Sequence, residues 1–466
     1  MKILILVPDG VGVRNYLYSD FIDYLVNDKH EIIIYHKLSN SAIKEIKNNK
    51  PQLTDFDEIP DFVENPKIRI LRESLAYARL LKNKKILKNN TILKFWSPSK
   101  KGIKKKILYF LSEFLGLFLS LSYKSILIAD AYFETQVSKV PETKVNTEKL
   151  KNLQPDIILN LHQRSPLTSP IISAAKSLNI KTATVIFSWD NVPKARLISR
   201  YNYYFVWSEL MKNQLQLLYP EISSNQIKIT GTPQFECYFK EDNYQTKKSF
   251  FKNHSLDENK KTICFSGNDI TSPYDAIYLN DICEELNKID EEKRPQIIFR
   301  RCPVDKSDRF NEVIEKYKDL ICSIDPDWKT EKEDKDSFTS IYPTINDNIL
   351  LVNTIKYSDL VINLGSTMAH DAAVLNKPCL YVNYNPIENS TFKVENVFNF
   401  EHFKSLKDIK AVGWLNNKNE INRKIFKALE KPNEIGEDRK EWLKRIVLHP
   451  LDNNSKVLNK TILECI

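Results

Sequence analysis

The sequence predicts an α/β protein built from two doubly wound domains in tandem. The chain has 466 residues, which allows two or three domains of about 150 residues each. Strand-like apolar runs alternate with helical stretches from Lys2–Val7 onwards, and the alternation restarts at Thr262–Ser266. Such alternation is typical of βαβ units and of parallel sheets. Two domains of this kind place ligands at the carboxyl ends of two sheets that face each other across a cleft.

The elements follow in order within each domain. In the first half we expect strands at Lys2–Val7, Glu31–Tyr35, Asp156–Leu161, Thr182–Phe187 and Tyr203–Val206. In the second half we expect them at Thr262–Ser266, Gln296–Arg300, Leu320–Ile324, Leu360–Asn363 and Pro378–Val382. The pattern breaks near Gly231, and a polar, charged stretch follows. We therefore predict domains at 1–238 and 239–435, with C-terminal helices at 436–466 that pack back towards the first domain.

The positive charge of the chain is local. The net charge is +9, but the stretch between Glu73 and Glu113 has no acid and carries eleven positive charges. An apolar run, Ile107–Tyr123, lies beside it and is at the short limit for a membrane span. Its leucines fall at helical spacing, which favours an amphipathic or buried helix. We predict a basic and apolar insert at about 74–130, either on an anionic membrane surface or as a solvated insertion.

Several classes of protein are excluded or disfavoured. The seven cysteines are scattered without a CxxC pair, which argues against a disulfide framework and a structural zinc site and fits a reducing cytosol. The N-terminus lacks the small-residue cleavage site of a signal peptide. Few aromatic residues interleave with the lysines, so we expect no nucleic-acid partner. No P-loop or GxGxxG motif occurs, and Asp325-Pro-Asp327 matches a metal-binding DxD only by chance composition.

A phosphate-binding turn is the strongest single motif. The segment Ser358–Pro378 reads SDLVINLGSTMAHDAAVLNKP, in which a buried strand ends at Asn363 and Gly365-Ser366-Thr367 opens a helix. Backbone N–H groups at such a turn suit a phosphate, and Ser and Thr add hydroxyl donors. An ordinary helix cap by Ser366 is the competing interpretation.

Residues 359–383 resemble the donor-binding motif of bacterial surface-polysaccharide glycosyltransferases of the GT-B type. That group is itself distantly similar to the CDP-glycerol glycerophosphotransferases. Further segments match it in order, and these are Phe187–Asn191 (FSWDN), Ile229–Glu236 (ITGTPQFE), Ile298–Val304 (IFRRCPV) and Ile324–Trp328 (IDPDW). Cys302 and Val304 depart from the group, because the usual His beside Pro303 is missing. Glu236 replaces the usual Asp, and Asn191 precedes Val-Pro-Lys instead of a Thr/Ser-rich turn.

The resemblance implies a donor site in the second domain and an acceptor site in the first. The expected donor-binding residues are Ser266, Gly267, Arg300, Arg301, Gly365, Ser366, Thr367 and Asp371. An arginine at a strand end can neutralise a diphosphate with its forked guanidinium and make the nucleotide a better leaving group without a metal. Asp371 is expected to accept hydrogen bonds from ribose hydroxyls. No cofactor and no metal are expected beyond the nucleotide-sugar substrate.

The first domain is expected to hold a general base and the acceptor. Asp9, His162 and Asp190 each follow a predicted strand and therefore lie along one rim of the sheet. Imidazole as a class titrates nearest neutral pH, and a helix cap is the competing role for Asp190. Arg14, Asn15 and Arg164 are candidates for holding an anionic acceptor. A transferase that retains configuration would not need this base.

The leading prediction is a bacterial, metal-independent glycosyltransferase of cell-surface glycan synthesis. It would move a sugar from a nucleotide-sugar donor to a glycan or lipid-linked acceptor, in the cytoplasm and peripherally on the inner face of the membrane. Three alternatives stay open, namely a CDP-polyol phosphotransferase, a nucleotide-sugar 2-epimerase and a non-catalytic GT-B scaffold. The missing His after Pro303 counts against the first, and the epimerase leaves the basic insert unexplained.

Overall fold

The computed structural model describes residues 1–98, 102–269, 271–330, 338–388 and 390–466. Lys100 and Lys101 of the predicted basic stretch lie outside these residues. The chain divides into two compact units. Unit 1 comprises Met1–Pro233, Phe400–His402 and Ile446–Ile466, and unit 2 comprises Gln234–Asn399 and Phe403–Arg445. The main change of unit follows Pro233, near the predicted boundary at 238.

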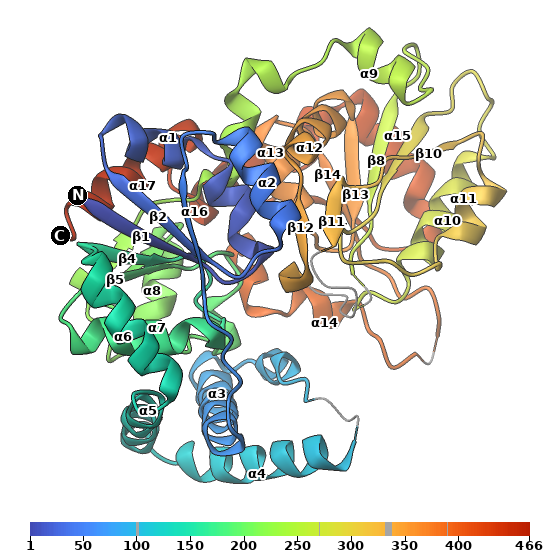
Figure 1. Ribbon diagram of the computed structural model, residues 1–466. Helices are drawn as coiled ribbons and strands as arrows, with labels where there is room; N and C mark the ends of the chain where they lie inside the picture. Colours follow the sequence, from blue (N-terminus) through green and yellow to red (C-terminus); the bar gives the residue numbers. More distant parts are fainter. Residues whose placement is uncertain (99–101, 270, 331–337, 389) are drawn as a thin grey trace. The chain divides into compact units, whose positions relative to one another are not determined.

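Unit 1 is built on a parallel sheet. Within the described part of the chain this sheet has seven strands in the order β3-β2-β1-β4-β5-β6-β7. Its strands are β1 (Lys2–Val7), β2 (Glu31–His36), β3 (Asp55–Glu58), β4 (Ile157–Asn160), β5 (Lys181–Val185), β6 (Tyr203–Val206) and β7 (Ile227–Ile229). Ile3–Val7 is completely buried, as expected of a central parallel strand that helices cover on both faces (Figure 1).

The helices of unit 1 begin at recognisable caps. Ser19, Ser39 and Asn65 each accept a hydrogen bond from a backbone N–H in the first turn of the helix that follows. The helices are α1 (Asp20–Asn27), α2 (Asn40–Asn49), α3 (Pro66–Leu87), α4 (Ile103–Leu119), α5 (Tyr123–Val137), α6 (Pro141–Leu153), α7 (Ser169–Ser177), α8 (Glu209–Leu218) and α17 (Asn454–Leu463).

Unit 2 repeats the doubly wound plan. Among the residues described, its main sheet has six parallel strands in the order β10-β9-β8-β13-β14-β15. They are β8 (Thr262–Ser266), β9 (Gln296–Arg300), β10 (Ile321–Ser323), β13 (Leu360–Asn363), β14 (Cys379–Val382) and β15 (Gly413–Leu415). A separate antiparallel pair joins β11 (Trp328–Thr330) to β12 (Ile341–Pro343). The two parallel sheets confirm the predicted α/β class with two doubly wound domains.

The helices of unit 2 flank both faces of its sheet (Figure 1). They are α9 (Lys247–Asn253), α10 (Asp275–Leu286), α11 (Asn311–Lys316), α12 (Ile345–Tyr357), α13 (Met368–Val374), α14 (Glu395–Phe398), α15 (Ile421–Glu430) and α16 (Arg439–Ile446). One core runs through the sheet, from Ile263 and Phe265 on β8 to Leu380 on β14 and Ile425 on α15. The strands of the sheet are thereby fixed at both faces, which positions the loops at their carboxyl ends.

The predicted insert is a helical subdomain of unit 1. It extends from Pro66 to Val137, beyond the predicted 74–130, and has its own core between α3 and α5. The apolar run Ile107–Tyr123 is not one helix, because Ser122 accepts a hydrogen bond from Lys124 N and caps a new helix. Within the described residues, no helix combines the length and the apolar character needed to cross a bilayer.

The C-terminal segment completes unit 1. Leu448 N donates to Trp207 O at 2.8 Å, and Asn454 Nδ2 donates to Thr232 O at 3.2 Å. Asn454 also explains Gly231, whose φ of +70° lies in the left-handed region. A Cβ at Gly231 would stand 2.2 Å from Asn454 Oδ1. The turn at 229–236 therefore requires glycine for both its backbone conformation and this close approach.

Candidate functional site

The sheet of unit 1 changes direction between β1 and β4. These strands are neighbours, although about 150 residues separate them in sequence, and the connections on either side run in opposite directions. Such a switch point leaves a crevice outside the carboxyl ends of the two strands. Asp9 follows β1, and His162 follows β4. Two of the three predicted candidates for the base thus come together at the point where the fold favours a ligand.

Asp9 and His162 form a buried pair. His162 Nδ1 lies 2.6 Å from Asp9 Oδ2, and the two side chains are 6% and 10% exposed. The second oxygen of Asp9, Oδ1, accepts a hydrogen bond from Val11 N at 3.1 Å. Asp9 therefore has both oxygens in use, which fixes the imidazole by Nδ1 and leaves Nε2 as the nitrogen turned away from the carboxylate. A carboxylate that holds Nδ1–H in this way makes Nε2 the proton acceptor.

The surroundings of His162 restrict its ring further. Its backbone N–H donates to Asn160 Oδ1 at 3.2 Å, and Asn160 Nδ2 donates to the Tyr201 hydroxyl at 2.7 Å. Phe187 packs edge-on against the imidazole with ring centroids 4.9 Å apart. The loop after β1 approaches β4 closely at Gly12, where a Cβ would stand 2.7 Å from Leu161 Cβ. Asn160 and Tyr201 were not predicted from the sequence.

Asp190 lies in the loop after β5, held by its own neighbours. Ser188 Oγ donates to Asp190 Oδ1 at 2.7 Å, and Lys194 Nζ lies 2.6 Å from Oδ2. Burial alone would raise the pKa of Asp190, but Lys194, His402 and Ser188 outweigh it and hold that pKa well below its ordinary value. A carboxylate this acidic is a poor proton acceptor, so the structure favours Asp190 as an anchor for Lys194.

His402 completes this cluster and was not predicted. It reaches unit 1 from a distant part of the sequence and packs edge-on against Trp189 with centroids 4.7 Å apart. Burial lowers the pKa of His402 to about 4, so its imidazole is neutral at physiological pH.

The predicted acceptor-binding residues lie on two loops of the same edge. Arg14 and Asn15 are half-buried in the helical turn Val13–Leu17, where Arg14 Nε donates to Asn15 Oδ1 at 3.4 Å. Arg164 follows His162 and donates to Asn191 Oδ1 at 3.3 Å. Asn191 adjoins Asp190, so Arg164 joins the loops after β4 and β5.

Unit 2 has a corresponding switch point between β8 and β13. Asn268 Nδ2, in the loop after β8, donates to Leu364 O, in the loop after β13, at 2.8 Å. Gly267 N donates to Arg300 O at 3.0 Å, and Ser266 is buried opposite Arg300 in the strand register. The predicted residues Ser266 and Gly267 therefore lie at the crevice of this sheet, beside the end of β9.

The glycine turn after β13 is pinned by its own strand. Asn363 Oδ1 accepts a hydrogen bond from Ser366 N at 2.8 Å, and Ser366 Oγ accepts one from Met368 N at 3.4 Å. Gly365 has a φ of +70°, and a Cβ there would stand 2.8 Å from Phe403 Cζ. Ser366 is half-buried and Thr367 exposed, so their hydroxyls lie at the surface of the turn.

Arg300 is paired with an acid that the sequence did not reveal. Its Nη2 donates to Asp347 Oδ1 at 2.6 Å, and both side chains are almost fully buried. Asp347 also accepts from Asp327 N at 2.9 Å and from the Trp328 indole at 2.7 Å. Nη1 of Arg300 is buried and has no hydrogen-bond partner among the described residues. The guanidinium is therefore neutralised on one side only.

The other predicted donor residues have clear local partners. Arg301 Nη1 donates to Ser307 O at 2.6 Å, and Asp371 accepts from the Tyr238 hydroxyl at 2.9 Å. Cys302 stands where the related group has the residue before its His. Burial raises the pKa of the Cys302 thiol to about 12, so it stays protonated and does not replace that His as a base.

A buried acid and an arginine organise the loop after β8. Asp275 accepts hydrogen bonds from Asn268 N, at 2.6 Å, and from the Ser272 hydroxyl. Burial raises the pKa of Asp275 to about 6. Arg309 Nη2 donates to Asn268 O at 2.7 Å. Neither residue was predicted from the sequence.

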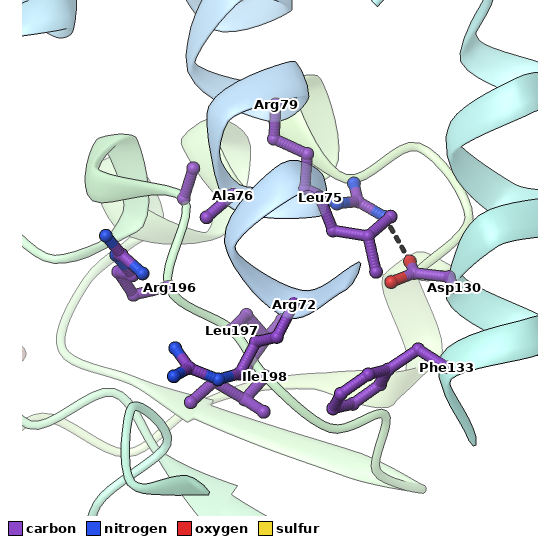
Figure 2. Close-up of a pocket in the computed structure, with 10 residues that line it drawn as sticks. Arg72, Leu75, Ala76, Arg79, Asp130, Phe133, Arg196, Leu197 and Ile198 are labelled. Atoms are coloured by element: carbon purple, nitrogen blue, oxygen red, sulfur yellow. Dashed lines mark hydrogen bonds and ion pairs between the residues drawn. The ribbon is translucent and has the colours of Figure 1, made fainter. Parts of the chain in front are cut away.

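A pocket in unit 1 lies where the insert joins the sheet, between α3, α5 and the loop after β5 (Figure 2). Arg72, Arg79 and Arg196 line it, but each is already paired with Glu64, Glu73 or Asp130. Its arginines are therefore neutralised and do not form an anion site. Across the described ranges, no group of three or more His, Cys, Asp or Glu side chains is placed to hold a metal ion.

Solved structures share the fold over the whole chain. A UDP-GlcNAc 2-epimerase from Neisseria meningitidis, bound to UDP-GlcNAc, aligns with a TM-score of 0.56, 13% identity and full coverage of both chains. A glycosyltransferase from Rickettsia africae aligns with a TM-score of 0.54 and 14% identity, over 99% of this chain and 98% of its own. The UDP-GlcNAc 2-epimerase from Methanocaldococcus jannaschii gives 0.53 and 14%, over 99% and 100%. No protein-family model and no curated sequence matches the chain.

Proposed function

We propose that the protein is a glycosyltransferase that uses a nucleotide-sugar donor. The likenesses to solved structures establish the GT-B fold of the chain, and at this level of identity they establish the fold alone. The Asp9–His162 pair carries the proposal, because a fixed imidazole at the switch point of unit 1 is suited to take a proton from an acceptor hydroxyl. The loops at the switch point of unit 2 are suited to hold the nucleotide.

The proposed reaction is a direct displacement. His162 Nε2 takes the proton of the acceptor hydroxyl, and the oxygen forms a bond to the anomeric carbon of the donor sugar. The bond between that carbon and the β-phosphate oxygen breaks, and the nucleoside diphosphate leaves with the electron pair. Asp9 stabilises the imidazolium that results. A single displacement of this kind inverts the anomeric configuration.

The donor half supplies charge stabilisation in this proposal. The hydroxyls of Ser366 and Thr367 lie at the turn after β13, and Arg301 is one residue beyond β9. Hydroxyl and guanidinium donors aimed at the diphosphate favour the departing nucleotide. Polyol-phosphate transfer receives less support, because Val304 follows Pro303 where the His is expected and the nearby Cys302 thiol stays protonated and offers no base.

Nucleotide binding tests the proposal first. Thermal unfolding is followed with UDP, GDP, CDP, CMP, TDP and ADP, without metal and then with magnesium. We expect one nucleoside diphosphate to raise the melting temperature, because a ligand that binds only the folded state stabilises it. Ser366→Ala should reduce that shift, and Ser249→Ala, at an exposed serine of α9, should leave it unchanged. No shift with any nucleotide at millimolar concentration would contradict a donor site.

The products then separate transfer from epimerisation. The matching nucleotide sugar is incubated with the enzyme and followed by NMR, with and without a lipid extract that supplies acceptors. Transfer releases the nucleoside diphosphate in amounts that depend on the acceptor. Conversion of the donor into its 2-epimer without any acceptor would show that the protein is an epimerase and would contradict the proposed transferase activity. Binding without any product would support the scaffold alternative.

A further inference from the structure

Helix α4 presents a continuous apolar stripe on its outer side. The stripe consists of seven large side chains, each 50–78% exposed, which are Ile103, Ile107, Phe110, Phe114, Leu117, Phe118 and Leu121. Apart from the adjacent Leu117 and Phe118, successive members are three or four residues apart, which places them along one face of the helix, and Leu121 follows just after its end. Soluble surfaces seldom leave this much contiguous apolar area uncovered, and such patches mark interaction sites.

The opposite face of α4 is committed to the protein. Ser112 and Gly116 are buried against α3, where a Cβ on Gly116 would stand 2.9 Å from Ser74 O. Glu113, the only acid of α4, accepts a hydrogen bond from the Trp96 indole at 2.8 Å. The inner face of α4 therefore holds its small residues. Glu113 lies between the two faces and is hydrogen-bonded to Trp96, so the apolar stripe carries no negative charge.

Positive charge borders the stripe. Lys104, Lys105 and Lys106 are exposed in the first turn of α4, and Lys124 is exposed at the start of α5. Lys104–Lys106 belong to the stretch of eleven positive charges without an acid, and Lys124 follows that stretch. An apolar face beside lysines is complementary to a bilayer with anionic headgroups, where each lysine near the surface adds attraction. A protein partner would have to supply an apolar groove and a matching acidic rim at once.

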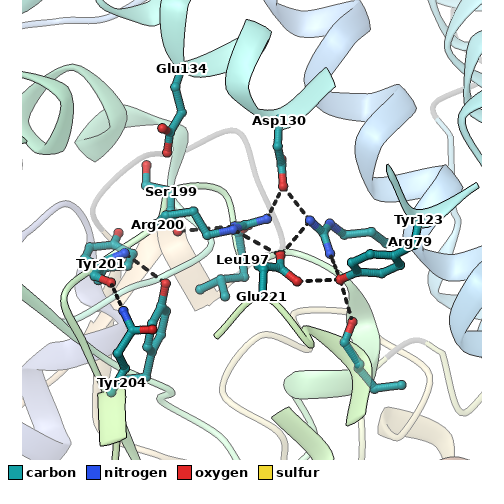
Figure 3. A network of polar contacts seen from close by, with 12 residues as sticks. Arg79, Tyr123, Asp130, Glu134, Leu197, Ser199, Arg200, Tyr201, Tyr204 and Glu221 are labelled. Atoms are coloured by element: carbon teal, nitrogen blue, oxygen red, sulfur yellow. Dashed lines mark hydrogen bonds and ion pairs between the residues drawn. The ribbon is translucent and has the colours of Figure 1, made fainter. Parts of the chain in front are cut away.

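The insert has a rigid root in unit 1 (Figure 3). Arg79 on α3 and Arg200, in the loop before β6, both bond to Asp130 on α5. Arg79 Nη2 also lies 2.9 Å from Glu221 Oε1, and the Tyr123 hydroxyl donates to Glu221 Oε2 at 2.5 Å. The charges of the two arginines and the two acids cancel at this buried junction between the insert and the sheet. These buried ion pairs therefore anchor the insert to unit 1. They fix the orientation of α4 and of its apolar stripe relative to the sheet.

A short chain of contacts joins α4 to the candidate acceptor loop. Tyr109 on α4 packs edge-on against Trp96 with ring centroids 5.9 Å apart. The Arg196 guanidinium lies over Trp96 at 5.7 Å, and Arg196 belongs to the same loop after β5 as Asp190 and Lys194. The apolar stripe and the carboxyl edge of β5 thus belong to one connected part of unit 1.

We propose that α4 docks unit 1 on an anionic lipid bilayer. The helix lies along the surface with the stripe in the boundary between headgroups and acyl chains, and Lys104–Lys106 contact the headgroups. Docking in this way brings the loop after β5 to the membrane, where a lipid-linked acceptor would be available. The proposal concerns binding of lipid and stands independently of the transferase reaction.

Vesicle co-sedimentation of the whole protein tests the proposal. The vesicles are phosphatidylcholine alone or with 30% phosphatidylglycerol. We expect partition into the anionic vesicles, about 100-fold weaker for the double variant Phe110→Ser/Phe114→Ser, because two large side chains no longer enter the apolar layer. The control Val145→Ser/Leu217→Ser removes two side chains of similar exposure, 53% and 52%, elsewhere in unit 1 and should bind as the wild type does.

The charge contribution is tested separately. Replacing Lys104, Lys105 and Lys106 by Gln should weaken partition into anionic vesicles by about 100-fold and leave the neutral vesicles unaffected. All replaced side chains are exposed, and unchanged thermal unfolding would confirm that the variants fold. Equal partition of the Phe double variant and the wild type would overturn the proposal. So would a wild type that binds neither vesicle but forms a dimer that the Phe variant dissociates, since a second copy would then cover the stripe.

Discussion

The carboxyl edges of the two sheets hold their charged groups differently. In unit 1, Asp9 is hydrogen-bonded to the imidazole of His162. In unit 2, Arg300 is neutralised by the fully buried Asp347, and Arg309 fixes the loop after β8 through backbone carbonyls. The first edge thus pairs a carboxylate with an imidazole, whereas the second pairs a carboxylate with an arginine and uses a further arginine to hold a loop in shape. In the proposed reaction, this difference corresponds to chemistry in unit 1 and nucleotide binding in unit 2.

Breaking the Arg300–Asp347 pair should have the largest effect on stability. Asp347→Asn leaves a buried guanidinium without its counter-charge, which should lower the free energy of unfolding by about 3–5 kcal/mol. Asp325→Asn is the matched control, because the Asp325 side chain is 58% exposed and lies 3.5 Å from Arg301. It should cost less than about 1 kcal/mol. Both free energies of unfolding are measured by urea unfolding. Equal losses in the two variants would show that the buried Arg300–Asp347 pair does not stabilise this edge more than an exposed contact does.

Removing the charge of Asp9 should affect turnover more than folding. Asp9→Asn no longer stabilises an imidazolium at His162, so we expect turnover to fall by about 100-fold. Asp57→Asn, on the outer strand β3 of the same sheet, should keep its activity. Turnover is measured as release of the nucleoside diphosphate, with the melting temperature as a check on folding. An active Asp9→Asn enzyme would remove the pair from the reaction.

Asp275 should give unit 2 a smaller effect that depends on pH. Its pKa in the folded protein is about 6, above the ordinary 3.8, so the ionised form is disfavoured by folding. Stability from this group is therefore gained as pH falls through 6, by about 1 kcal/mol between pH 7 and pH 5. The free energy of unfolding of Asp275→Asn should lack this gain. Parallel pH profiles of the variant and the wild type would contradict the assignment.

The sequence predicted the fold and much of the edge of unit 1. Asp9 and His162 were found because each follows an apolar run, and parallel strands bring such positions to one edge. The bond between them could not be predicted, since it depends on β1 and β4 being neighbours. His402 gave no signal, because it lies beside Asp190 through folding over more than 200 residues. Its position depends on packing that no local pattern encodes.

The edge of unit 2 was harder to predict. Arg300 was expected to contact phosphate, and that role stays a prediction, but the pairing with Asp347 was not foreseen. The helical spacing of the sequence places Asp347 on α12, but it does not indicate which side chain Asp347 contacts in the fold. The Gly365–Thr367 turn was placed correctly at the end of β13, because an apolar run followed by Gly-Ser-Thr is a local signal, and the positive φ of Gly365 was found only in the structure.

One pair of variants tests the division between the two edges most directly. For His162→Asn and for Ser366→Ala, turnover and the dissociation constant of the nucleoside diphosphate are measured side by side. We expect His162→Asn to lose about 100- to 10,000-fold in turnover and to bind the nucleotide as the wild type does. Ser366→Ala should instead weaken nucleotide binding. An active His162→Asn enzyme, or one that loses nucleotide binding together with turnover, would contradict the assignment of proton transfer to unit 1.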